Sequence, residues 1–251
     1  MRSVDPGNDF ASWRAVAKDL LAADVPPDQV IFEKEEGLFS ALQAESVPYQ
    51  SSPAAKVPAA FLDLAKGASC HADESRWALL YRILWRIVKG GEHRLCEISS
   101  DPDIAKAVIM RKNVSREIHK MHAFVRFRLV DADEQSGRER FTAWFEPDHW
   151  IVEAGAPFFR GRFANMDWSI FTPKGCAHWN GEALVFTKGI AADPIGEGDA
   201  MEEHWKTYYR NIFNPARLKV KMMQTEMPKK YWKNLPEAEL IDELIQGSKS
   251  R

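Results

Sequence analysis

Two short stretches of the chain carry side chains that could perform acid–base or metal chemistry. Ile-His-Lys-Met-His at 118–122 supplies two imidazoles, and Phe-Glu-Pro-Asp-His at 145–149 supplies two carboxylates and a third imidazole. A polar loop at 131–139 predicts a hairpin that pairs residues near 124 with residues near 146, which would bring both stretches together. Imidazoles beside carboxylates act as acids and bases or bind divalent ions. The candidate catalytic residues are His119, His122, Glu146, Asp148 and His149.

The same residues also allow a structural interpretation. His122 falls near an apolar helical stripe, where histidines are often hydrogen-bonded core residues. Asp148 would then cap the following helix and Glu146 would pair with Arg126. A zinc site needs three or more ligands converging at about 2.0–2.2 Å, and the chain has no HExxH motif. We expect no bound cofactor, and a divalent metal stays the alternative.

A second candidate site is the basic segment from 210 to 233, in which Glu226 is the one acid. The whole chain has a formal net charge of -2, so any field that attracts nucleic acid must be local. Cations beside aromatic rings suit a phosphate backbone with stackable bases, although a protein interface or plain surface fits the same pattern. With two arginines at the start of the predicted sheet, the nucleic-acid-binding candidates are Arg126, Arg128, Arg217, Lys219, Lys221, Lys229, Lys230, Tyr231 and Trp232.

The spacing of apolar residues changes from helical to strand-like at 116–128. This change predicts a joint between a helix and a sheet, which would position both candidate sites. Before it, a stripe with helical spacing runs through Ile104, Val108, Arg111, Ser115, Ile118 and His122, flanked by Ala107, Val114 and Met121. From residue 123 the apolar residues alternate with polar ones, as in a half-buried strand. A helix is therefore expected to lead directly into a sheet.

The other elements predict an α+β fold, an antiparallel β-meander packed against several helices, with helical N- and C-terminal regions. Strands are expected at 30–32, 123–130, 140–146, 168–172, 176–179 and 183–186, with Asn180-Gly181 as a hairpin turn. A helix is expected at 148–163, kinked or divided at Pro157. The predicted division is a helical appendage at 1–45, a linker or loop at 46–57, a core domain at 58–247 and a tail at 248–251.

Composition limits the class of protein. The 251 residues are 45% hydrophobic, with nine Trp and fourteen Phe, enough for a sizeable core. Three widely spaced cysteines exclude a disulfide framework or zinc finger and favour a reducing compartment. The sequence shows neither a signal peptide nor an apolar run long enough to span a membrane, so we expect a cytoplasmic protein with no membrane contact.

Several longer phrases resemble one bacterial family. These are Trp-Ala-Leu-Leu-Tyr-Arg-Ile-Leu-Trp-Arg (77–86), Ile-His-Lys-Met-His-Ala-Phe-Val-Arg-Phe-Arg (118–128), Trp-Phe-Glu-Pro-Asp-His (144–149), Phe-Asn-Pro-Ala-Arg-Leu-Lys-Val (213–220) and Met-Pro-Lys-Lys-Tyr-Trp-Lys-Asn-Leu-Pro (227–236). The family is a domain of unknown function found N-terminal to UdgX-type uracil-DNA-binding glycosylase domains, or as a separate DNA repair or metabolism protein paired with a radical-SAM partner. The resemblance covers most of residues 1–247.

The resemblance implies a DNA repair context and supplies no catalytic residues. The leading hypothesis is a nucleic-acid-binding accessory domain that holds DNA while a uracil-DNA glycosylase-like or radical-SAM partner does the base chemistry. The second hypothesis is a metal- or His-dependent enzyme acting on nucleic acid or nucleotides. The third is a protein-interaction module that docks a repair partner through its apolar C-terminal helix.

Overall fold

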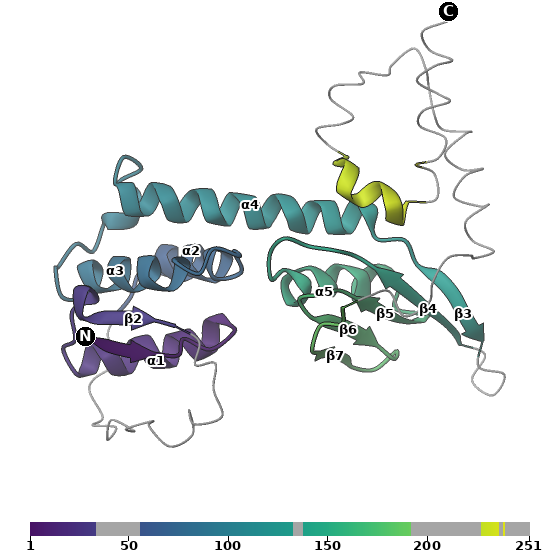
Figure 1. The fold of residues 1–251 in the computed structure, drawn as a ribbon, viewed down its shortest axis with the longest axis horizontal. Helices are drawn as coiled ribbons and strands as arrows, with labels where there is room; N and C mark the ends of the chain where they lie inside the picture. Colours follow the sequence, from purple (N-terminus) through teal and green to yellow (C-terminus); the bar gives the residue numbers. More distant parts are fainter. Residues whose placement is uncertain (34–55, 133–137, 192–226, 236–237, 239–251) are drawn as a thin grey trace, which may run out of the picture. The chain divides into compact units, whose positions relative to one another are not determined.

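The computed structural model describes residues 1–33, 56–132, 138–191, 227–235 and 238. It divides into two compact units, Met1–Arg116 and Glu117–Arg251. Within the described residues the fold is α+β, as predicted (Figure 1). None of the described helices combines the length and apolarity that crossing a membrane requires.

Unit 1 is built mainly from helices around one apolar core. Its helices are α1 (Phe10–Ala22), α2 (Ala59–Ser69), α3 (Arg76–Val88) and the first part of α4 (Pro102–Phe124), with short 3-10 turns η1 (Pro27–Gln29) and η3 (Leu95–Glu97). Strands β1 (Arg2–Val4) and β2 (Val30–Phe32) pair in parallel. Asp9 caps α1 by accepting the backbone N–H of Ser12 at 2.9 Å.

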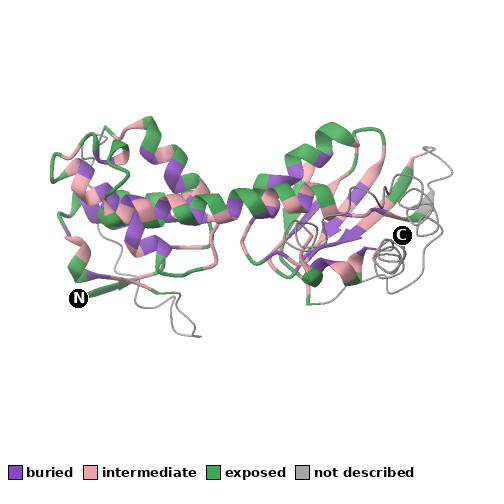
Figure 2. Ribbon diagram, turned by 90° about the horizontal axis from the view of Figure 1, so that it is seen from above, coloured by how far each residue is buried: buried purple, intermediate pink, exposed green. Residues whose placement is uncertain are grey.

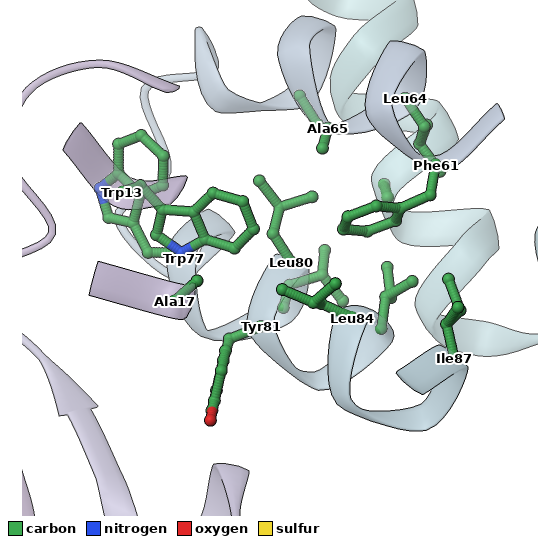
Figure 3. Packing of buried hydrophobic residues seen from close by; sticks show 14 of the residues in the cluster. Trp13, Ala17, Phe61, Leu64, Ala65, Trp77, Leu80, Tyr81, Leu84 and Ile87 are labelled. Atoms are coloured by element: carbon green, nitrogen blue, oxygen red, sulfur yellow. The ribbon is translucent and has the colours of Figure 1, made fainter. Parts of the chain in front are cut away.

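The unit 1 core joins residues on both sides of the predicted linker (Figure 3). Trp13 of α1 stacks on Trp77 of α3, with ring centroids 6.1 Å apart, and Phe61 of α2 belongs to the same buried cluster. The described residues of the predicted helical appendage at 1–45 share a core with α2 and α3. Apolar residues of α1 have no core of their own to enter, so they complete this one.

The basic side of α3 is largely committed to ion pairs within unit 1. Arg82 pairs with Asp103 at 2.7 Å, and Arg86 pairs with Asp101 and Glu92 at 2.8 Å each. Arg76 is fully buried and donates to the carbonyl oxygen of Ser69 at 2.9 Å, with its guanidinium 4.3 Å from the Trp77 ring centroid. The ion pairs and hydrogen bonds on this side of α3 therefore stabilise unit 1.

Unit 2 contains the five-stranded sheet seen among the described residues, in the order β3-β4-β5-β6-β7. Its elements are β3 (Arg128–Ala132), β4 (Glu139–Trp144), α5 (Val152–Arg162), β5 (Asp167–Phe171), β6 (Cys176–Trp179), β7 (Leu184–Thr187) and the 3-10 segment η5 (Lys229–Asn234). Neighbouring strands are antiparallel except β4 and β5, which are parallel because α5 carries the chain between them. The predicted meander is thus interrupted by one βαβ crossover. Helix α5 runs through Pro157 as a single element.

Candidate functional site

The predicted joint lies at the end of α4. The helix ends at Phe124 and β3 begins at Arg128, so the first residues of the expected strand complete the helix instead. The Arg126 guanidinium donates to the carbonyl oxygens of Ala123 at 2.7 Å and Val125 at 3.3 Å, which satisfies acceptors that a helix end leaves open. Val125 and Phe127 point into the core, while Arg126 and Arg128 stay half-buried.

A buried carboxylate, Glu117, organises the side of the joint facing the 145–149 stretch. Its two oxygens accept the backbone N–H groups of Asp148 and His149, each at 2.7 Å. Oε1 also receives the Tyr231 hydroxyl at 3.3 Å and lies 3.4 Å from Lys230 Nζ. Lys230 pairs in addition with Asp148. We call these five residues the Glu117 cluster.

The pKa shifts in the Glu117 cluster are those expected of residues that hold the fold together. Burial raises the pKa of the Tyr231 hydroxyl to about 12, so it stays protonated and donates. Burial would lower the pKa of Lys230, but its bonds to Asp148 and Tyr231 raise it overall. Burial lowers the pKa of His149 against the opposing effect of Glu117 and Asp148. Because its oxygens are occupied by these donors, Glu117 holds the chain together here.

The remaining members of the predicted catalytic group lie in other contacts. Glu146 accepts from Trp144 Nε1 at 2.9 Å and pairs with Lys233 Nζ at 2.7 Å. His122 Nε2 is 3.0 Å from the carbonyl oxygen of Gly155, and His119 is exposed on α4. Among the described residues, Glu146 thus contacts Trp144 and Lys233, and α5 begins without a side-chain cap from Asp148. In the described part of the chain, no three His, Cys, Asp or Glu side chains are placed to hold a metal ion.

An aromatic pocket opens on the other side of the α4 end, within unit 2. Its volume is about 400 Å³. The lining residues are His122, Ala123, Val125, Arg126, Phe127, Phe141, Phe158, Phe159, Arg162, Phe163 and Met166. The pocket thus combines rings with two arginines, and no carboxylate is among these lining residues. Burial lowers the pKa of His122, so its ring is neutral near pH 7.

The basic arm at 227–235 is part of unit 2, in which it buries Tyr231 while its lysines stay exposed. Tyr231 is 1% exposed and stacks on Phe145 with centroids 4.9 Å apart. Trp232 Nε1 donates to the Met227 carbonyl oxygen at 3.0 Å, and Lys229 is exposed. The predicted stacking of a base on Tyr231 does not fit this position, because the ring is already enclosed. Arg217, Lys219 and Lys221 lie outside the described residues.

Comparison with protein families assigns most of this architecture to one domain. The model of DUF4130, a domain of unknown function, matches residues 74–237. The chain belongs to the DUF4130 family. No curated protein and no solved structure matches the chain. The DUF4130 region begins just before α3 and ends just after the arm, so it contains the joint, the Glu117 cluster and the aromatic pocket.

The DUF4130 region also holds a feature that the sequence interpretation missed, a row of cations along α4. Lys112, Arg116 and Lys120 lie within an arc of about 80° at the helical spacing of 100° per residue. We call these three residues the cationic face. Within the described part of the chain, no carboxylate pairs with its two lysines or its arginine. Exposed positions recur along α4 in Figure 2.

The missed residues share one cause, a helical stripe assigned one position out of place. The buried positions of α4 are Ile104, Ala107, Met110, Val114, Glu117 and Met121. The predicted stripe kept Ile104 and then followed the neighbouring row, with Ala107, Val114 and Met121 at its flank, and it did not include Glu117. The available signal was composition: from Ile104 to Phe124 the helix of this DUF4130 domain has a single acid, Glu117. A lone carboxylate on a basic helix points to a buried, paired role.

Proposed function

We propose that this protein is a cytoplasmic nucleic-acid-binding accessory domain of DNA repair, which holds a strand through the cationic face of α4. The observation that carries the proposal is that face, on which Lys112 and Arg116 are exposed and Lys120 is half-buried, while Glu117, the one acid between Ile104 and Phe124, is buried. The resemblance noted from the sequence supplies the repair context and the expected partner, a uracil-DNA glycosylase-like domain or a radical-SAM protein.

The spacing of the cationic face suits a polyanion. Lys112, Arg116 and Lys120 follow at intervals of four residues, so successive charges are about 6 Å apart along the axis. A row of this kind contacts successive phosphates and releases their counterions, giving affinity that depends on salt and little on sequence. The basic arm is less suited to this role, because Lys230 and Lys233 are already paired with carboxylates.

A salt titration tests the proposal. Binding of a fluorescein-labelled single-stranded oligonucleotide to the full chain is followed by anisotropy from 50 to 300 mM salt. For three phosphate contacts on a single strand, the logarithm of the affinity should fall with the logarithm of salt with a slope of about -2. The triple variant Lys112→Gln, Arg116→Gln, Lys120→Gln should lose most of this slope.

The matched control removes the same charge elsewhere. Arg14, Lys56 and Lys66 are exposed cations of unit 1, and replacing all three by Gln leaves α4 intact. This control should keep the wild-type slope. The proposal is wrong if both triple variants behave alike, or if the wild-type chain shows no salt-dependent binding.

A further inference from the structure

The aromatic pocket lies where the cationic face ends. Ala123, one of its lining residues, comes three residues after Lys120, less than one turn further along α4. Arg126 and Arg162 also line the pocket. A strand whose phosphates follow the cationic face towards the C-terminal end of α4 therefore reaches an opening with further positive charge and aromatic walls.

Phe158 is the ring of this pocket best placed to meet a ligand. Its side chain is 46% exposed although it is large and apolar. One face of the ring stacks on the His122 imidazole, with centroids 4.1 Å apart and planes 20° apart. Phe159 meets it edge to face at 5.3 Å. Phe158 is thus held in place by neighbours while part of its surface is open to solvent.

His122 contributes a rigid and uncharged surface to this arrangement. A carbonyl oxygen can only accept, so the bond to Gly155 places the imidazole proton on Nε2 and leaves Nδ1 as an acceptor. Gly155 provides this contact at close range: a Cβ built there would lie 2.9 Å from Met121 Sδ and 3.7 Å from His122 Nε2. The fixed ring supports the stack with Phe158.

We propose that the aromatic pocket binds one unpaired nucleobase of a strand held on the cationic face. This inference rests on the proposed function and adds a base-binding subsite to it. A volume of about 400 Å³ lies in the range of small-ligand sites. Rings accept any base by stacking, and Arg162 among the lining residues favours a ligand that carries phosphate. An apolar peptide would gain nothing from that charge.

Two strands of equal length and charge test the subsite with the full chain. One is oligothymidylate, and the other is the same sugar–phosphate chain with abasic residues throughout. The oligothymidylate should bind about tenfold more tightly, the effect expected for one stacked base. Phe158→Ala should reduce its affinity to that of the abasic strand and leave abasic binding unchanged. Arg162→Gln should weaken both strands, because it removes charge rather than a ring.

The control is Phe186→Ala on β7. This ring is 38% exposed, comparable with Phe158, and does not line the pocket. The Phe186→Ala protein should bind oligothymidylate as tightly as the wild type. Equal affinity for the two strands, or equal behaviour of the two Phe variants, overturns the base subsite while salt-dependent binding through the cationic face survives. Absence of binding to either strand overturns the proposed function as well.

Discussion

Replacing Glu117 by Gln tests the anchor of unit 2. The side chain is about 5% exposed, and both oxygens accept backbone N–H groups at 2.7 Å. Gln keeps one carbonyl acceptor but turns an NH₂ group towards the other N–H, and the negative charge beside Lys230 is lost. Hydrogen bonds to charged groups contribute about 1.5–3 kcal/mol each, so we expect the free energy of unfolding to fall by about 2–3 kcal/mol. Glu117→Ala should lower the free energy of unfolding by about 3–5 kcal/mol.

Urea unfolding and amide hydrogen exchange measure this effect. Exchange at Asp148 and His149 should accelerate about 30-fold or more in Glu117→Gln, since each 1.4 kcal/mol is a factor of ten. Glu182→Gln, at an exposed position in the β6–β7 turn, serves as the control and should change stability by no more than about 0.5 kcal/mol. A Glu117→Gln protein as stable as this control would refute the anchor role.

Three further predictions follow from buried polar groups. Tyr231→Phe should lower the free energy of unfolding by about 0.5–1.5 kcal/mol and leave oligonucleotide affinity unchanged; weaker binding by a folded variant would restore a base-stacking role. Burial lowers the pKa of His178 below its ordinary value of 6.5, so its contribution to stability is complete above pH 6.5 and decreases as the pH falls. Urea midpoints from pH 7.5 to 5.5 should show a smaller decrease for His178→Gln than for the wild type, and parallel profiles would contradict this. Arg76→Met should lower the free energy of unfolding, measured with urea, by about 2–3 kcal/mol, and Arg82→Gln should lower it by less than about 1 kcal/mol. Equal losses would contradict a stabilising role for the buried Arg76 guanidinium.

Local patterns predicted most of the described elements correctly. The change from helical to strand period located the joint, and the Asn180-Gly181 pair marked the β6–β7 hairpin, where Asn180 Oδ1 accepts the N–H groups of Glu182 and Ala183. The parallel pairing of β4 with β5 was missed. A helix between two strands is the usual sign of a parallel crossover, whereas the prediction has the helix at 148–163 interrupting an antiparallel meander.

The candidate site was harder to predict because it depends on contacts between distant residues. His149 and Glu117 are brought together by hydrogen bonds to backbone N–H groups, which leave no mark in the side-chain pattern. The prediction for the basic arm rests on composition alone, and in the structure two of its lysines, Lys230 and Lys233, pair with Asp148 and Glu146. The strength of the anchor and the enclosure of Tyr231 are properties of the folded chain that spacing does not encode.

Lysine-reactivity footprinting tests the central claim, strand binding on the cationic face, most directly. The full chain is acetylated with and without a single-stranded oligonucleotide at low salt, and the modified positions are read by mass spectrometry. Lys112 and Lys120 should be protected when the strand is present, while Lys66, an exposed lysine of α2, keeps its reactivity. Unchanged reactivity of Lys112 and Lys120 in a chain that binds the strand would contradict the account.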